Sequence, residues 1–251
     1  MTVTTIRLKI PELSGQEIPA DALQRAERLA AGYLKTEMVM RKHGVQHTIV
    51  VFGGTRIQES GQTSITGATN YYQIAREFGE IVGRSGQGPD DCRLTLVTGG
   101  GPGIMEAANR GASDVGAKSI GLNIRLPHEQ VPNRFISEEL SFNFQYFAIR
   151  KLHFLVRAKA LVVFPGGFGT MDELFETLNL VQCRRIKPLP VVLVGRAFWQ
   201  RAVNMQFLAE SGLIDPEDSQ LFWYADTAQE IWDGIVDWYA RVGAPLLCEG
   251  R

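Results

Sequence analysis

Two glycine-rich segments of similar design stand at residues 99–103 (GGGPG) and 166–170 (GGFGT). Each follows a short apolar run and precedes a stretch with helical character. Glycine lets backbone N–H groups approach an anion closely, and a helix N-terminus adds partial positive charge. Parallel strands present their carboxyl ends at one edge of a sheet, so both turns are expected to converge there. Together they predict a site for a phosphate-bearing ligand; for the first turn alone, a tight turn without a ligand is an equal alternative.

Neither turn matches a standard cofactor fingerprint. A dinucleotide-binding turn would need a third glycine where Glu106 stands, and the chain contains no GxxxxGKS/T phosphate loop. Binding of dinucleotides or nucleoside triphosphates at these turns therefore loses support.

A cluster of carboxylates follows the second turn. Thr170 and Glu173 have the T-x-x-E spacing of a helix capping box, so a purely structural role for Glu173 is one interpretation. The other is catalytic, because this spacing would place the Glu173 carboxylate on the first helical turn, beside the phosphate turn. There it could stabilise an oxocarbenium-like transition state at a ribose C1′ and position or deprotonate the attacking water. Asp172 and Glu176 are less favoured substitutes.

A basic stripe lies on the preceding helical stretch. Arg150, His153 and Arg157 recur at i, i+3 and i+7 and so share one face. The residue pattern favours a solvated face. The alternative is that Arg150 or Lys151 points into the anion site and orients the phosphate or the departing base.

Apolar β-rich runs alternate with helical stretches, which predicts an α/β fold with a parallel sheet flanked by helices. The expected strands are residues 48–52, 94–98, 119–124, 160–164 and 191–194. The expected helices between them are residues 71–84, 104–115, 147–158, 171–183 and 198–211. Residues 55–69 read as a polar loop, either a lid or an ordinary surface loop.

Two further helices are expected at the ends, for packing or oligomer contacts. One spans residues 20–43, with Leu23, Ala26, Leu29 and Ala30 near helical spacing. The other spans residues 227–242, with Ile231, Ile235 and Trp238 on one stripe.

The composition predicts one domain over residues 1–251, with 45% hydrophobic and 21% charged residues. A net charge of −1 argues against nucleic acid or an anionic membrane as partner. The three cysteines and four histidines show no metal-ligand spacing, so neither a disulfide framework nor a metal site is expected. With no signal-peptide pattern and no apolar run of membrane-spanning length, the expected location is the cytoplasm.

The motifs GGGPGIME at residues 99–106, RK at 150–151 and PGGFGTMDE at 165–173 resemble, in order and spacing, the LOG (Lonely Guy) family. These are cytokinin riboside 5′-monophosphate phosphoribohydrolases, once labelled lysine decarboxylases. The resemblance covers about residues 48–194, with helical extensions at 1–47 and 195–251 as in the larger members. It implies a modified Rossmann-like fold, a homodimer or larger homo-oligomer, no cofactor, and hydrolysis of a nucleoside 5′-monophosphate, including AMP, to free base and ribose 5-phosphate.

The resemblance also implies residue roles. Glu173 corresponds to the catalytic carboxylate and Arg150 to its partner arginine. The substrate and phosphate site would comprise Gly99, Gly100, Gly101, Gly103, Glu106, Lys151, Gly166, Gly167, Gly169 and Thr170.

One departure concerns the family pattern MHxRK, which reads FAIRK at residues 147–151 here. The arginine and lysine are present, whereas the methionine and histidine are not, which leaves the base preference open. A non-catalytic nucleotide sensor or carrier on the same fold is the alternative function. It keeps the glycine turns but does not need Arg150 together with Glu173.

Overall fold

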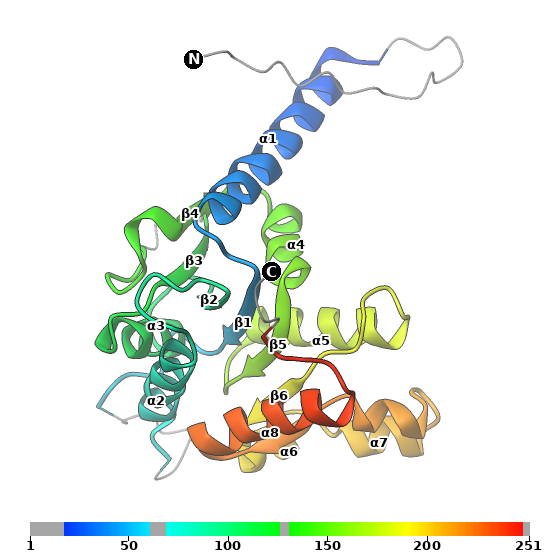
Figure 1. Cartoon of the computed structure of the whole chain (residues 1–251). Helices are drawn as coiled ribbons and strands as arrows, with labels where there is room; N and C mark the ends of the chain where they lie inside the picture. Colours follow the sequence, from blue (N-terminus) through cyan, green and yellow to red (C-terminus); the bar gives the residue numbers. More distant parts are fainter. Residues whose placement is uncertain (1–17, 61–68, 126–130, 248–251) are drawn as a thin grey trace.

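The computed structural model describes residues 18–60, 69–125 and 131–247. Its centre is a seven-stranded sheet in which all neighbouring strands run parallel, in the order β4-β3-β2-β1-β5-β6-β7 (Figure 1). The strands are β1 (His47–Phe52), β2 (Leu94–Thr98), β3 (Ser119–Ile124), β4 (Ser141–Phe144), β5 (Ala158–Val163), β6 (Val191–Val194) and β7 (Trp223–Ala225).

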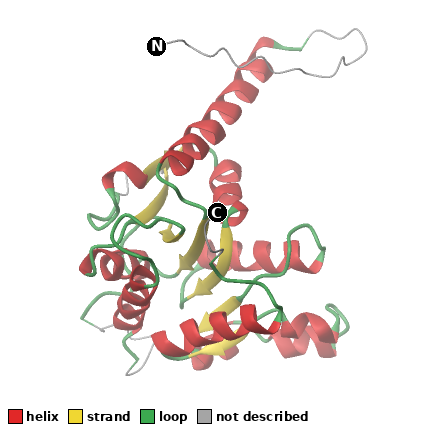
Figure 2. Ribbon diagram, in the orientation of Figure 1, coloured by secondary structure: helices red, strands yellow, loops and turns green. Residues whose placement is uncertain are grey.

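Helices connect the strands and cover both faces of the sheet (Figure 2). The α-helices are α1 (Ala20–Lys42), α2 (Tyr71–Arg84), α3 (Ile104–Asp114), α4 (Phe147–Val156), α5 (Phe168–Gln182), α6 (Arg196–Ala202), α7 (Met205–Glu210) and α8 (Ala228–Arg241). Two short 3₁₀ helices are η1 (Glu138–Leu140) and η2 (Pro216–Gln220).

Alternate residues of each central strand pack into two separate hydrophobic cores, one on each face of the sheet. Ile49 and Val51 of β1 pack with α2, α3 and α8, whereas Val50 and Phe52 pack with α1, α4, α5 and α6. Because successive side chains of a strand point to opposite faces, a strand buried on both faces must be apolar throughout. The predicted α/β class with a buried parallel sheet is therefore confirmed.

The predicted strands all exist, but two others were missed. In β4, Phe142 and Phe144 are buried while Ser141 and Asn143 are exposed, so this edge strand lacks a continuous apolar run. The other missed strand, β7, has only three residues. Both form the edges of the sheet, where one-sided burial weakens the sequence signal.

Several helix boundaries were wrong. The helix expected at 147–158 ends at Val156, because β5 already begins at Ala158. The helix expected at 171–183 begins at Phe168. The helix expected at 198–211 is two helices, since the Asn204 side chain accepts a hydrogen bond from the Phe207 N–H and starts α7 anew.

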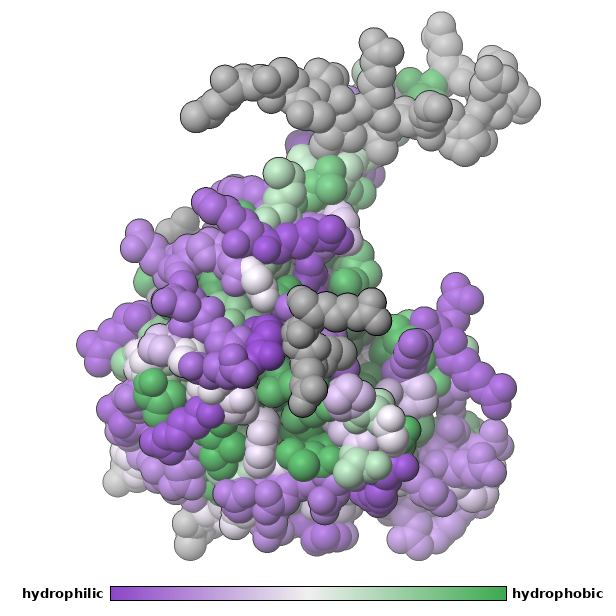
Figure 3. Space-filling model, in the orientation of Figure 1, coloured by the Kyte–Doolittle hydropathy of each residue, from purple (hydrophilic) through white to green (hydrophobic). Residues whose placement is uncertain are grey.

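The N-terminal helix α1 extends away from the body of the molecule (Figure 1). The apolar positions predicted for packing lie in its projecting half: Leu23 is exposed, and none of Ala26, Leu29 and Ala30 is fully buried. Figure 3 shows polar and apolar residues mixed along this projection. The buried residues of α1 are instead Thr36, Glu37 and Met40, in the half that meets the sheet.

In α8, by contrast, the predicted stripe is confirmed. Ile231 and Ile235 are buried, and Trp238 packs, partly buried, against the same core. Of the predicted polar loop at 55–69, residues 61–68 lie outside the described residues. Across the described ranges, no helix combines the length and apolar character needed to cross a membrane.

Candidate active site

The candidate site lies at the topological switch point of the sheet, where the order in which strands are added reverses direction. From β1 the chain adds β2, β3 and β4 on one side, and it then returns through α4 to place β5 on the other side of β1. The carboxyl ends of strands at such a switch point form the usual ligand crevice of open α/β sheets. The turns after β1, β2 and β5 meet here: the Gly54 N–H donates to the Pro165 carbonyl at 2.8 Å, and the Ile104 N–H to the Gly54 carbonyl at 3.2 Å.

The first glycine turn has a backbone conformation that requires glycine at two positions. Gly100 and Gly103 hold φ angles of 76° and 72°, which L side chains rarely adopt. A Cβ at Gly100 would collide with the Asn123 side chain, and one at Gly103 with the backbone of Gly54 and Thr55. Gly99, Gly100, Gly101 and Gly103 are all buried, so the elements around this turn enclose it.

A buried polar network that the sequence analysis missed supports this turn. Asn133 donates from Nδ2 to the carbonyls of Gly100 and Gly101 at 3.3 and 3.1 Å, and to Asn109 Oδ1 at 3.0 Å. Thr98 Oγ1 donates to the same Asn109 oxygen at 2.7 Å and accepts from the Gly100 N–H at 3.0 Å. Because buried amides need partners, an asparagine within an otherwise apolar helix or strand could have signalled such a network.

The second glycine turn is open. Gly167, Phe168 and Gly169 are exposed, and Phe168 retains 96% of its accessible surface. Gly167 is the N-cap residue of α5, so the first N–H groups of this helix have no intrahelical partner. These groups, together with the partial positive charge of the helix end, can receive an anion.

The predicted capping box is wrong, because α5 begins earlier than expected. With Gly167 at the N-cap, Thr170 lies within the helix. No side-chain hydrogen bond caps the N-terminus of α5. Glu173 consequently lies on the second helical turn rather than the first. The structural interpretation of Glu173 as a capping residue loses its basis.

Glu173 is a buried carboxyl group with only 7% of its surface exposed. Burial raises its pKa to about 7, and the nearby charges of Asp172 and Glu176 add to the rise, against the opposing effects of Lys151 and Arg150. In the described residues no cation lies close enough to form an ion pair with it. Such a carboxyl group can exchange a proton near neutral pH.

Arg150 is the cation that faces this carboxyl group from α4. Its Nε donates to the Leu122 carbonyl at 2.7 Å, its guanidinium lies 5.2 Å from the Phe154 ring centre, and a Cβ on Gly99 would collide with it. Burial lowers the pKa of Arg150, while the charge of Glu173 raises it. Arg150 thus contacts β3 and the first glycine turn, and its charge acts on Glu173.

The predicted solvated face of α4 is therefore wrong. Arg150 lies in the crevice, His153 is buried, and Arg157 makes an ion pair with Glu37 of α1 at 2.9 Å. His153 and Arg157 are covered by α1, through Tyr33 and Glu37, whereas Arg150 reaches β3.

Lys151 joins α4 to α5 beside the site. Its Nζ lies 2.8 Å from carboxylate oxygens of both Asp172 and Glu176. Burial alone would lower the pKa of Lys151, but the hydrogen bonds to these two carboxylates outweigh it and the net pKa is raised. Asp172 and Glu176 are therefore engaged by Lys151, whereas Glu173 has no ion-pair partner among the described residues.

Glu106 takes a different environment. It lies on the first turn of α3 and accepts a hydrogen bond from the Tyr72 hydroxyl of α2 at 3.3 Å. Unlike Arg150 and Lys151, it is not among the charges that shift the pKa of Glu173. No group of three or more potential metal ligands occurs among the residues that the structure describes.

A parallel sheet with two glycine turns at its switch point, and with the charge of Arg150 acting on the buried Glu173, defines a Rossmann-like protein with a candidate anion site. The chain belongs to the family described as possible lysine decarboxylase, whose sequence profile matches residues 105–235, just over half of its length. The resemblance to the Lonely Guy family is confirmed by relatives of that name.

Cytokinin riboside 5′-monophosphate phosphoribohydrolase LOG3 of Arabidopsis thaliana is 26% identical over 192 residues, which cover 72% of this chain and 83% of the relative. The probable enzyme LOGL3 of Oryza sativa subsp. japonica is 27% identical over 160 residues, covering 61% and 74%. Pyrimidine/purine nucleotide 5′-monophosphate nucleosidase of Escherichia coli K12 is 28% identical over 155 residues, which cover 59% of this chain but only 30% of that larger protein.

Among solved structures, the structural-genomics protein TM1055 superposes with a TM-score of 0.53 at 20% identity, covering 76% of this chain and 99% of its own. This similarity confirms the Rossmann-like fold.

Proposed function

We propose that this protein is a hydrolase of N-glycosyl compounds that cleaves a nucleoside 5′-monophosphate to the free base and ribose 5-phosphate. The observation that carries the proposal is the buried Glu173 facing Arg150 beside an open helix N-terminus. Plant and bacterial relatives named for such activities align with 72% and 59% of this chain, at 26 and 28% identity. AMP and N6-substituted AMP, as in cytokinin ribosides, are the first substrates to test.

In this proposal the second glycine turn binds the 5′-phosphate through backbone N–H groups, and the first glycine turn forms the wall behind the ribose. Lys151 acts by holding Asp172 and Glu176 away from the crevice, and Glu106 lines its outer side. The complete set of proposed substrate-binding residues is Gly99, Gly100, Gly101, Gly103, Glu106, Lys151, Gly166, Gly167, Gly169 and Thr170.

The chemistry needs one carboxylate and one cation. The bond between C1′ and the base nitrogen breaks, and its electron pair leaves with the base. Ionised Glu173 stabilises the positive charge that develops at C1′ and accepts a proton from the attacking water, whose oxygen bonds to C1′. The departing base nitrogen gains one proton, which balances the proton that Glu173 takes from the water and restores the carboxylate. Arg150 orients the substrate and keeps Glu173 partly ionised at neutral pH.

The first test is Glu173→Gln, with Glu217→Gln of an exposed carboxylate as the matched control. Removing the carboxylate is expected to lower kcat by a factor of about 100 or more, while AMP binding measured by calorimetry stays within a fewfold of the wild type. The control is expected to keep full turnover. Free base and ribose 5-phosphate are followed by chromatography across a panel of purine and pyrimidine nucleoside monophosphates.

Three outcomes would contradict this assignment. Unchanged turnover in Glu173→Gln would remove Glu173 from the mechanism. Loss of AMP binding together with turnover would assign it to binding. Tight AMP binding by the wild type without any product would indicate the sensor or carrier function.

We further propose that the protein is a homo-oligomer whose subunits meet through α4 and α5. Large apolar side chains are exposed on these adjacent helices: Phe147, Leu152, Val156, Phe168 and Phe175. Exposed apolar residues on neighbouring helices can form an association surface, and Phe168 lies at the proposed phosphate-binding turn. Leu152→Glu is expected to reduce the molar mass in sedimentation, whereas Val236→Glu, an exposed apolar residue of α8, is expected to leave it unchanged. Equal masses for both variants would contradict the proposed interface.

We propose a cytoplasmic location. The buried Cys92 and the exposed Cys183 would remain thiols in such a reducing compartment. Fractionation of cells that express the protein tests this proposal.

A further inference from the structure

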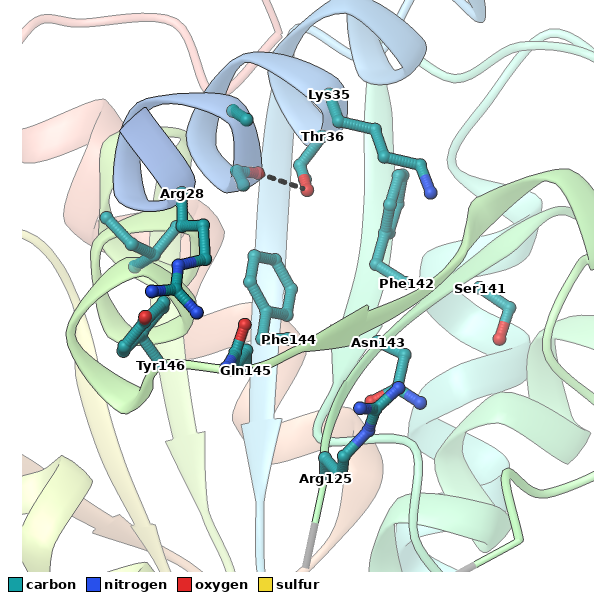
Figure 4. A pocket seen from close by; sticks show the side chains of 13 residues that line it. Arg28, Lys35, Thr36, Arg125, Ser141, Phe142, Asn143, Phe144, Gln145 and Tyr146 are labelled. Atoms are coloured by element: carbon teal, nitrogen blue, oxygen red, sulfur yellow. Dashed lines mark hydrogen bonds between the residues drawn. The ribbon is translucent and has the colours of Figure 1, made fainter. Parts of the chain in front are cut away.

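A second cavity, of about 430 Å³, lies between α1, the end of β3, β4 and the start of α4 (Figure 4). Arg28, Lys35 and Thr36 line it from α1, and Tyr146 and Ile149 from the start of α4. Its size falls within the range of small-molecule sites in proteins. None of the candidate active-site residues lines it.

Three cations from two separate parts of the fold surround this cavity. Arg28 and Lys35 come from α1, and Arg125 follows directly after β3. None of the lining residues is acidic, and none of these three cations makes an ion pair with another residue that the structure describes. In a chain of net charge −1, a cavity lined by three cations and no carboxylate attracts a polyanion.

The rest of the lining combines aromatic and amide groups. Phe142 and Phe144 are largely buried and form an aromatic floor, with the Tyr146 ring at one end. Asn143 and Gln145 alternate with them along the chain and offer hydrogen-bond donors and acceptors. Aromatic rings beside amide groups can bind a heterocyclic base by stacking and hydrogen bonding.

The sheet topology separates this cavity from the candidate active site. The glycine turns follow β2 and β5, on either side of β1, whereas the cavity opens at β4, the edge strand beyond β3. Its outer wall is α1, which belongs to the helical extension before the core region.

We infer that this cavity is a second ligand site, which binds a nucleoside triphosphate. The three cations can together engage a triphosphate group, which carries more charge than the single phosphate expected at the glycine turns. The aromatic floor supplies the surface for the base. This inference stands apart from the proposed hydrolase activity, because it depends on residues that have no part in that reaction.

The test is calorimetric titration of the full-length protein with ATP, at low salt and at 0.5 M salt. Lys35→Glu and Arg125→Glu are each expected to weaken ATP binding by about tenfold or more. Lys42→Glu makes the same charge change on α1 outside the cavity and is expected to change the affinity less than twofold. High salt is expected to weaken binding by the wild type more than by either cavity variant.

Photolabelling with 8-azido-ATP locates the site without a substitution that could disturb folding. The label is expected in the peptide that contains residues 141–149. AMP hydrolysis by Lys35→Glu in the absence of ATP is expected to equal that of the wild type. No ATP binding by the wild type, equal binding by all three variants, or a label confined to the glycine turns would overturn the inference.

Discussion

At the scale of single residues, the environment of Glu173 decides what the site can do. An exposed glutamate is fully ionised at neutral pH, whereas burial holds the pKa of this one at about 7. Arg150, whose guanidinium stays charged throughout this range, cannot exchange a proton in its place. The acid–base chemistry of the crevice therefore belongs to one carboxyl group.

The pH dependence of turnover follows from this pKa. If the ionised form of Glu173 is required, kcat is expected to fall about tenfold per pH unit below pH 7 and to level off above it. The measurement is initial-rate kinetics at saturating AMP from pH 5 to pH 9.

The substrate phosphate itself titrates near pH 6, so a control must separate the two groups. The negative charge of Asp172 raises the pKa of Glu173, and Asp172→Asn is expected to move the acidic limb of the profile to lower pH. The titration of the substrate does not depend on this residue. If the acidic limb of the pH profile does not move, the titrating group is the substrate phosphate and not Glu173.

At the scale of elements, the first glycine turn owes its shape to close backbone contacts. Gly103 combines a positive φ angle with contacts to Gly54 and Thr55, through which the turns after β1 and β2 meet. Gly116 has almost the same φ angle, 73°, but nothing lies within 4 Å of where its Cβ would stand.

Alanine substitutions at Gly116 and Gly103 therefore separate the energetic cost of a positive φ angle from the cost of a steric collision. Gly116→Ala is expected to lower the free energy of unfolding by about 1 kcal/mol, the cost of a positive φ angle. Gly103→Ala is expected to cost about 2 kcal/mol more, because the backbone must also move. Urea denaturation measures both; equal losses would show that the contacts at Gly103 are easily relieved.

The sequence predicted the central elements well, because strands buried on both faces and amphipathic helices leave strong patterns. β2, β3, β6 and α2 have the boundaries expected from their apolar residues. Prediction from the sequence failed where a residue's neighbours in the structure come from elements far away in the chain. The basic stripe with His153 looked solvated because α1, which covers it, lies more than 100 residues earlier. The early start of α5 was missed for a local reason, because Thr170 and Glu173 offered a stronger capping pattern than Gly167, the actual N-cap residue.

At the scale of the whole molecule, a buried ion pair holds α1 on the body. Glu37 of α1 accepts a hydrogen bond from Arg41 at 2.6 Å and pairs with Arg157 at 2.9 Å. Burial raises the pKa of Glu37, but the two arginines outweigh it and the net pKa is lowered. The stability from this carboxylate is therefore present above its ordinary pKa and is lost as the pH falls through its folded value.

Removing the Glu37 carboxylate and removing Arg41 are expected to have unequal effects. Glu37→Gln leaves the buried Arg157 without its partner and is expected to cost about 3 kcal/mol of unfolding free energy at pH 7. Arg41→Ala removes a largely exposed partner of the same carboxylate and is expected to cost less than about 1 kcal/mol. Urea denaturation at pH 7 and pH 4 is the measurement, with the difference between Glu37→Gln and the wild type expected to shrink at the lower pH. Similar losses for both variants would contradict the role given to the Glu37–Arg157 pair.

The all-parallel order of the sheet also determines when the protein can fold during its synthesis. β1 is flanked by β2 and β5, and Val50 pairs with Leu161, 111 residues further along the chain. At a translation rate of about 5–20 residues per second, β1 waits roughly 5–20 s for its second neighbour after leaving the ribosome. Through that interval its apolar residues have no complete core to enter. We therefore expect a nascent chain that stops before β5 to bind general chaperones, and one that extends past β6 to be released.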